Sequence, residues 1–222
     1  MFTSAILLTL KLAATTTTLL LILCLPLASW LANTHSKSKP WVEAIVALPL
    51  VLPPTVLGFY LLLLMSPNSA FGAWWVSQFG QTLAFSFWGL VLGSMAYSLP
   101  FVLQPLQRTF EGQGSRLSEA AHTLGATPWH TFWDIRMPLA LPGLVAACVL
   151  GFAHTVGEFG VVLMIGGNIP GQTQVLSILL FDQVESLNYQ VAHQIAAGLV
   201  ITSVLVLFAL YRWNSKAAVR IG

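Results

Sequence analysis

The sequence predicts an all-α integral membrane protein with five transmembrane helices, its N-terminus outside the cell and its C-terminus in the cytoplasm. Of its 222 residues, 56% are hydrophobic and only 7% are charged, whereas soluble domains carry roughly 25% charged residues. A bilayer core is crossed by about 20 apolar residues, and five runs approach or exceed this length: 12–31, 44–65, 82–103, 139–165 and 195–211. The polar stretches between them are too short for a soluble domain, so 1–222 is expected to form one transmembrane domain.

The orientation follows from the positive charges, because Lys and Arg accumulate in cytoplasmic loops. The chain has nine of them. Eight fall on one side of the predicted spans: Lys37, Lys39, Arg108, Arg116, Arg136, Arg212, Lys216 and Arg220. Only Lys11 falls on the other side. The segment 105–138 is therefore expected in the cytoplasm, and the segments 66–81 and 166–194 outside.

The first span is expected to be retained. A cleaved signal peptide would need a basic start, an apolar stretch of about 7–15 residues and a small-residue cleavage site. Only Lys11 precedes the run 12–31, which is longer than such a stretch. Cys24 and Cys148 both lie inside apolar runs, so no disulfide framework is expected.

The second span contains three prolines, Pro49, Pro53 and Pro54, each of which removes a helix hydrogen-bond donor and predicts a kink. Irregular backbone at membrane depth persists only where protein or a water-filled cavity covers it. We therefore expect this span to line a pathway near Thr55 and Gly58. The alternative is an ordinary kinked helix that only packs.

The fourth span contains Gly157 and Gly160, small residues that allow membrane helices to approach closely. Between them lies Glu158, the only carboxylate inside any apolar run. An ionisable group within a membrane span indicates a functional site, so Gly157 and Glu158 are expected to form part of a pathway or gate. A structural, hydrogen-bonded or interfacial role for Glu158 near the outer boundary is the alternative.

Two polar segments complete the pattern. Outside, the turn-rich stretch 166–171 is followed by apolar residues at helical spacing, which predicts a short helix lying in the membrane interface. In the cytoplasm, Pro105 is expected to close the third span and Gly125 to end a short helix over 116–124. Thr127 and Pro128 are then expected to cap and begin a second helix that Pro138 stops. Four residues are expected to share one face of that helix: Trp129, Phe132, Trp133 and Arg136.

The resulting helix–glycine–helix unit, residues 116–136, is called the knob below. The segment 119–138, which begins inside the knob, reads Glu-Ala-Ala, three residues, Gly, nine residues, Ile, one residue and Met-Pro. It resembles the EAA loop of ABC-transporter permease subunits, with Met137 in place of the usual Leu. The resemblance implies that the knob docks a cytoplasmic ATPase. The residues it implies for this contact are Glu119, Ala120, Ala121, Gly125, Trp129, Phe132 and Ile135.

The chemistry of the knob suits such a docking site. Small alanines allow close approach, Gly125 allows a tight bend, and apolar anchors can fill a partner's groove. Glu119 can add a charge-assisted hydrogen bond. The alternative is an amphipathic loop that rests on lipid headgroups.

Three further segments, 48–58, 157–160 and 166–173, resemble bacterial molybdate permease subunits, and the similarity covers roughly residues 5–213. The resemblance implies a type I ABC importer fold and a multi-pass homodimer in the bacterial inner membrane. It also implies two cytoplasmic ATPases that use ATP and Mg²⁺, and a periplasmic oxyanion-binding protein. Tungstate and sulfate are the alternative substrates. The resemblance implies no cofactor, metal or nucleic acid for this chain itself.

Absent motifs weigh against rival classes. The sequence has no Gly-Lys dipeptide and hence no P-loop, and it has no Gly-x-Ser-x-Gly or His-Glu-x-x-His motif. A free-standing secondary anion transporter is expected to carry coupling-ion carboxylates and inverted repeats. A membrane enzyme is expected to carry a group of catalytic residues, and no local motif of that kind is present.

The spans themselves offer neutral groups to an anion. No Lys or Arg lies within spans two to five, and ionised Glu158 would repel an anion. The neutral donors expected to meet an oxyanion are Thr55, Ser86, Ser94 and Ser98.

Overall fold

The structure is a computed structural model that describes residues 2–114 and 116–219. This described part contains helices and no strands, which confirms the all-α prediction. In chain order the elements are α1 (Phe2–Asn33), α2 (Lys39–Val51), α3 (Pro54–Met65), α4 (Ala70–Phe79), α5 (Phe87–Gln113), α6 (Arg116–Thr123), α7 (Pro128–His130), the π-helical turn η1 (Thr131–Arg136), α8 (Met137–Gly157), α9 (Gly160–Gly166), α10 (Leu176–Glu185) and α11 (Tyr189–Val219).

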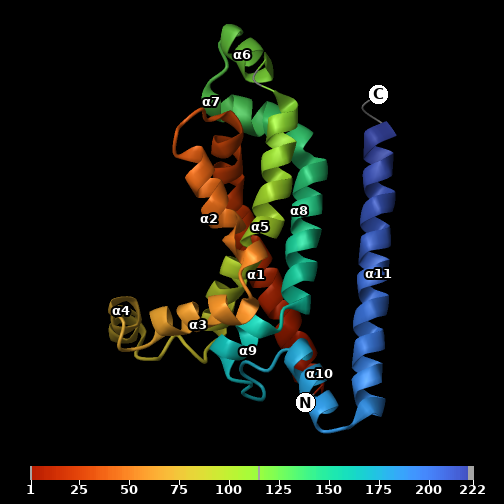
Figure 1. Ribbon diagram of the computed structural model, residues 1–222. Coiled ribbons are helices and arrows are strands. Elements are labelled where there is room, and N and C mark those ends of the chain that lie inside the picture. The colour runs from red at the N-terminus through yellow and green to blue at the C-terminus, as the bar shows by residue number, and fades with distance from the viewer. Residues whose placement is uncertain (1, 115, 220–222) are drawn as a thin grey trace.

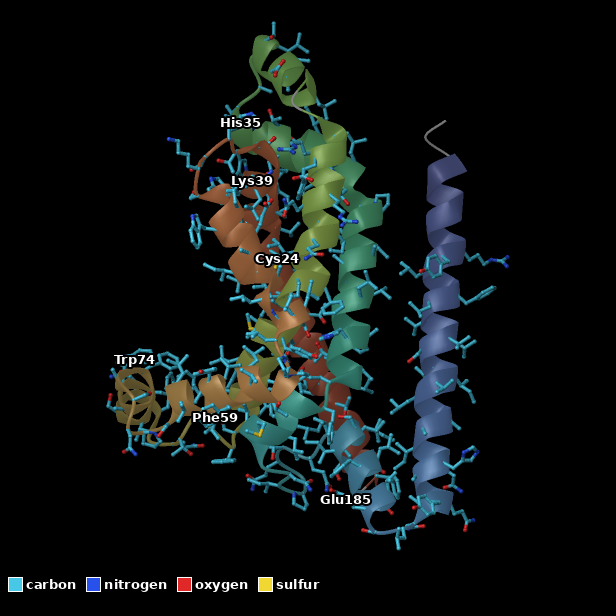
Figure 2. All side chains as sticks on the ribbon, in the orientation of Figure 1. Cys24, His35, Lys39, Phe59, Trp74 and Glu185 are labelled. Atoms are coloured by element: carbon cyan, nitrogen blue, oxygen red, sulfur yellow. The ribbon has the colours of Figure 1, made fainter. Side chains whose placement is uncertain are left out.

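The five predicted spans each have a counterpart. Four helical stretches within the described residues are long and apolar enough to cross a membrane: Phe2–Asn33, Phe87–Gln113, Pro128–Gly157 and Tyr189–Arg212. Counting the bent pair α2–α3 as one span gives the fifth. In Figure 1 the long helices run lengthwise, with the N-terminus beside α10 at one end and the C-terminus at the end that carries α6. Figure 2 places His35 and Lys39 towards the α6 end and Glu185 at the opposite end, an arrangement that agrees with the predicted N-out, C-in orientation.

The second span is broken rather than kinked. α2 ends at Val51, α3 begins at Pro54, and the two axes are bent by 114°. Pro53 and Pro54 cause the break because neither can donate a backbone hydrogen bond, whereas Pro49 lies inside α2 without ending it. The 12 residues of α3 extend only about 18 Å, and the helix lies across the long helices (Figure 1).

The third span is longer than predicted. Pro105 does not close it, because α5 continues to Gln113 with Pro100 and Pro105 inside the helix. The continuation is held by packing. Leu106 and Phe110 are fully buried in a core cluster with residues of α1, α2 and α8, and burying each such side chain contributes about 1.5–3 kcal/mol. That burial offsets the hydrogen bond that proline removes.

Pro138 likewise does not stop the second helix of the knob. α7, η1 and α8 form one helical stretch from Pro128 to Gly157. A proline ring in a regular helix clashes with the carbonyl four residues earlier, and the wider π-helical turn ahead of Pro138 relieves this crowding. The knob is therefore continuous with the fourth span.

The prediction of an unbroken fourth span over 139–165 was wrong. α8 ends at Gly157, and Glu158 has an extended backbone with ψ of 131°. Helical structure resumes only at Gly160 with α9. Glycines on either side of Glu158 disfavour a continuous helix here, since glycine is among the weakest helix formers. Both proposed pathway spans are consequently interrupted.

The external segments contain two short helices. α4 lies within the predicted loop 66–81, where Ser69 caps its N-terminus and Gly80, with φ of 69°, ends it. Both residues are local helix signals, so the sequence itself contains the information that specifies α4. α10 confirms the short helix predicted after 166–171, but it is not only a surface helix. Its residues Ile178 and Leu179 are buried in two different core clusters.

Candidate functional site

The knob has the predicted helix–glycine–helix geometry. α6 ends at Thr123, and Gly125 has a φ of +86°, a conformation that side chains with a Cβ rarely adopt. The backbone N–H of Ala126 donates to the Ala121 carbonyl at 3.0 Å and closes the turn. The Thr127 hydroxyl then accepts a hydrogen bond from the His130 N–H at 3.3 Å, which confirms the predicted cap.

The knob exposes a mixed acidic and apolar surface. Glu119 and Ala120 are exposed, whereas Ala121 is buried inside the turn and cannot face a partner in this conformation. Leu124 is 89% exposed and Trp129 69% exposed, so both side chains project away from the rest of the chain. Leu124 was not among the contact residues expected from the sequence. Its position, an apolar residue directly before the turn glycine, is the sequence feature that indicates its exposure.

The second half of the knob carries an aromatic cluster. The Trp133 ring lies 5.7 Å from that of Trp129 and 5.2 Å from that of Phe132, centroid to centroid. Trp133 is exposed, while Phe132 and Ile135 are half-buried. Arg136 does not share this exposed face, contrary to the prediction, because the π-helical turn changes the angular spacing and the side chain is buried.

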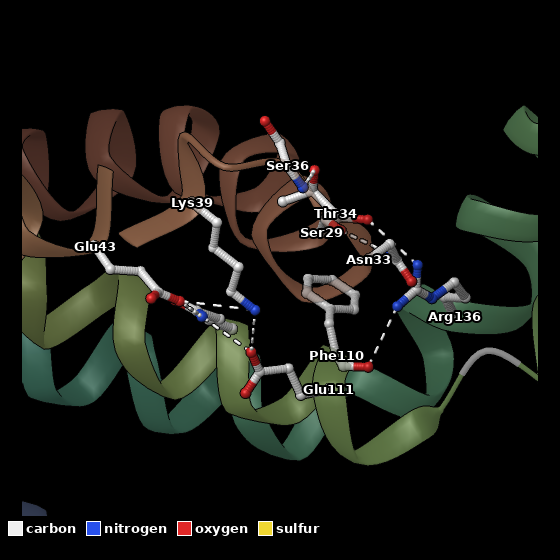
Figure 3. A network of polar contacts seen from close by, with 10 residues as sticks. Ser29, Asn33, Thr34, Ser36, Lys39, Glu43, Phe110, Glu111 and Arg136 are labelled. Atoms are coloured by element: carbon white, nitrogen blue, oxygen red, sulfur yellow. Dashed lines mark hydrogen bonds and ion pairs between the residues drawn. The ribbon is translucent and has the colours of Figure 1, made fainter. Parts of the chain in front are cut away.

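A polar network that sequence reasoning missed joins α2 to α5 at the same end of the molecule (Figure 3). Lys39 Nζ lies 3.3 Å from Glu111 Oε1 and 3.8 Å from Glu43 Oε1. Gln107 Nε2 donates to Glu43 at 2.7 Å and to Glu111 at 3.0 Å. The groups are partly exposed, so each ion pair contributes little, but together they tie the two helices across 64 to 72 residues of sequence.

The four predicted pathway residues are brought into one region by the two helix breaks. Gly160, at the start of α9, lies so close to Pro54, at the start of α3, that an added Cβ would be 2.8 Å from the proline Cβ. One turn further along α3, a Cβ on Gly58 would be 2.8 Å from that of Met164. Thr55 and Gly157 are exposed, whereas Gly58 and Glu158 are buried. Thr55 and Gly157 are thus the two that face open space.

Glu158 belongs to a buried polar cluster. It is 3% exposed, and within the described residues neither carboxylate oxygen has a hydrogen-bond partner. Ser94 of α5 lies close to the carboxyl but without hydrogen-bond geometry. Nearby, Ser98 Oγ lies 2.9 Å from His154 Nδ1 and 3.1 Å from Thr155 Oγ1. His154 was not proposed as a site residue from sequence, although it lies one turn before Glu158.

The four hydroxyl groups predicted to meet an oxyanion differ in how exposed they are. Ser94 and Ser98 are fully buried in this conformation, so neither faces open space. The Ser86 hydroxyl caps α5 by accepting from Gly89 N–H at 3.1 Å. Thr55 is the only exposed member of the four proposed hydroxyl groups.

Comparison with known proteins identifies the family to which this chain belongs. Residues 24–220 match the family model described as "Binding-protein-dependent transport system inner membrane component". The chain belongs to this family. A curated relative, the molybdenum transport system permease protein ModB of Azotobacter vinelandii, is 57% identical over 94% of this chain and 92% of its own. ModB of Haemophilus influenzae is 36% identical over 86% of each chain. The sulfate transport system permease protein CysT of Escherichia coli is 33% identical over 88% of this chain and 70% of its own.

Solved structures share the fold of this family member. A bacterial alginate ABC transporter, crystallised with an alginate pentasaccharide-bound periplasmic protein, matches 99% of this chain and 79% of its own with a TM-score of 0.73 at 20% identity. An amino acid ABC transporter matches 97% of this chain and 93% of its own with a TM-score of 0.63 at 19% identity. These matches confirm the predicted ABC importer permease fold.

Proposed function

We propose that this chain is the membrane-spanning permease subunit of an ATP-driven ABC importer that moves molybdate across the bacterial inner membrane. The observation that carries the proposal is the 57% identity to a molybdenum transport permease over nearly the full length of both chains. The sulfate permease relative, at 33% identity, makes sulfate the second candidate. Tungstate, another tetrahedral oxyanion, is expected to compete with molybdate.

The transporter is proposed to contain two copies of this chain, two cytoplasmic ATPases and one external binding protein. The family description, which names a binding-protein-dependent system, supports the external partner. The sequence lacks a P-loop, so ATP and Mg²⁺ are assigned to the partner ATPase. This chain then acts without enzymatic activity of its own.

The knob is proposed as the ATPase docking site. Glu119, Leu124 and Trp129 are exposed on it and offer one charge and two apolar anchors. Its second half continues without interruption into α8, so a displacement of the knob is transmitted along α8 as a rigid-body movement. That movement arrives at the break beside Glu158, where α9 contacts α3.

The pathway is proposed to run beside the two breaks. Exposed Thr55 and Gly157 line it in the conformation described, and Ser94, Ser98 and Glu158 are positioned to border it when the breaks separate. Hydroxyl donors suit an anion that must bind weakly enough to leave. Selectivity among oxyanions is assigned mainly to the external binding protein.

Reconstitution tests this function. The chain, its ATPase and its binding protein in liposomes should take up molybdate only when ATP is present inside and the binding protein outside. Tungstate should inhibit uptake, and sulfate in large excess should not. Uptake of sulfate without molybdate would establish a sulfate permease, and anion uptake by the chain alone would establish a secondary transporter.

A further inference from the structure

Arg136 occupies an unusual position at the junction between the knob and the fourth span. It ends η1 and directly precedes α8. Among the residues whose side chains the structure describes, it is the only Lys or Arg that is buried, with 5% of its surface exposed. Burying a charge is costly unless hydrogen bonds compensate it, so its contacts indicate what it holds.

The guanidinium group contacts two other helices. Nη2 donates to the Phe110 carbonyl at 3.3 Å, and Nε donates to Gln113 Oε1 at 3.1 Å, both on α5. Nη1 lies 3.4 Å from Ser29 Oγ on α1. Figure 3 shows Arg136 between Ser29 and Phe110. The charge also lies over the Phe110 ring, 5.1 Å from its centroid.

The bonds to α5 run in both directions. Gln113 Nε2 donates to the Arg136 carbonyl at 3.0 Å, while its Oε1 accepts from Arg136. No carboxylate forms an ion pair with Arg136 within the described residues. The compensation therefore comes from a backbone carbonyl, an amide and a hydroxyl, whose positions are fixed by the helices that carry them.

The choice of arginine has a physical reason. The last four carbonyls of a helix lack intrahelical donors, and Phe110 is within the last turn of α5, which ends at Gln113. A cation is favoured at that end by the helix dipole. The planar guanidinium carries five donors in a fixed fork, whereas lysine presents a single point charge. Only arginine can serve Phe110, Gln113 and Ser29 together.

These contacts close the base of the knob. The knob leaves α5 after Gln113 and returns to the membrane helices at Arg136, 23 residues later. The paired bonds between Gln113 and Arg136 join its two ends, and the bond to Ser29 adds α1. A knob open at its base would flex when pushed, whereas a closed one moves α5 and α8 together.

We propose that Arg136 is the positioning residue that converts ATPase movement at the knob into movement of α1, α5 and α8 as one body. This role rests on the proposed function. Without Arg136, the ATPase still docks and still hydrolyses ATP, but the displacement is absorbed at the base of the knob. The signature is uncoupling, seen as more ATP hydrolysed for each oxyanion transported.

The test uses the reconstituted complex of permease, ATPase and binding protein. Three variants are compared with wild type: Arg136→Leu, Arg136→Lys and Gln113→Leu. The matched control is Arg108→Leu, an exposed arginine on the same helix as Gln113. Three quantities are measured: ATPase recovered with the permease, ATP hydrolysis, and oxyanion uptake.

Arg136→Leu should keep ATPase recovery near the wild-type level and raise the ratio of ATP hydrolysed to oxyanion transported by about tenfold, the factor that corresponds to the loss of a single hydrogen bond to a charged group. Arg136→Lys and Gln113→Leu should give intermediate ratios, and Arg108→Leu the wild-type ratio. A wild-type ratio in both Arg136 variants overturns the proposal. If Arg136→Leu fails to reach the membrane, Gln113→Leu takes its place as the deciding variant. A wild-type ratio of ATP hydrolysed to oxyanion transported in Gln113→Leu then overturns the proposal.

The ratio is measured with whichever oxyanion the wild-type complex transports. Transport of sulfate in place of molybdate would refute the assigned substrate and leave the Arg136 test intact. Conversely, normal molybdate uptake with unchanged ratios in all variants would refute the role of Arg136 and leave the assigned substrate intact.

Discussion

Gly160 and Pro54 bring the two interrupted membrane spans into contact: a Cβ on Gly160 would lie 2.8 Å from the Cβ of Pro54. Each residue opens a helix directly after a break, α9 in one case and α3 in the other. The backbone of α9 can approach α3 this closely because Gly160 has no side chain. We therefore expect any movement of α9 to displace α3 as well.

Enlarging Gly160 should disturb this contact. Gly160→Val forces α3 and α9 apart, and overpacking of this kind costs about 1–3 kcal/mol. The variant should insert into the membrane, melt at a lower temperature and lose most of its oxyanion uptake. Gly198→Val on α11, where an added Cβ meets nothing within 4 Å, is the matched control and should behave as wild type. Wild-type melting and uptake of Gly160→Val would show that the contact is unimportant.

At Gly125, a larger residue would strain the backbone without colliding with a neighbouring group. Its φ is +86°, yet an added Cβ would meet nothing within 4 Å. Gly125→Val should therefore act through strain alone, on the order of 1–3 kcal/mol, and should reduce both ATPase recovery and uptake. Gly125→Asn should retain more of both, because asparagine tolerates positive φ. Equal behaviour of the two variants in pull-down and uptake assays would contradict this explanation.

Charge reversal at the knob tip should weaken ATPase docking. Glu119 is exposed, so Glu119→Lys is expected to leave folding unchanged and to lower ATPase recovery by about tenfold, the magnitude of one charge-assisted hydrogen bond. His130→Ala serves as the comparison. It removes an exposed pair with Asp134 at 2.9 Å, which contributes little. If the two variants recover the same amount of ATPase in a salt-matched pull-down, Glu119 does not contact the ATPase.

Single cysteines should distinguish open from packed positions beside the breaks. In a background lacking Cys24 and Cys148, Thr55→Cys and Gly157→Cys should react with small aqueous thiol reagents, because both positions are exposed. Gly58→Cys should react more slowly, since Gly58 is packed against Met164. Reaction rates should change between nucleotide-free and ATP-bound complexes if these positions line the pathway. Absence of reaction at 55 and 157 in every nucleotide state would limit them to packing.

Much of the fold was determined by local properties of the sequence. Five apolar runs specify five spans because each must satisfy its own backbone hydrogen bonds within lipid. Gly125 and Thr127 specify the bend and cap of the knob because positive φ and side-chain capping are properties of a few neighbouring residues. The EAA spacing around Glu119 likewise indicates the family without reference to any tertiary contact.

The tertiary structure decided where helices end and which polar groups meet. Pro105 and Pro138 each allow a helix to stop, but burial of Leu106 and Phe110 in one case and a π-helical turn in the other carry the helix through. The same turn directs Arg136 inward to α5 and α1. The contact between Gly160 and Pro54 joins residues more than a hundred positions apart. Such outcomes depend on packing between distant segments, which hydropathy, propensity and spacing along one chain do not contain.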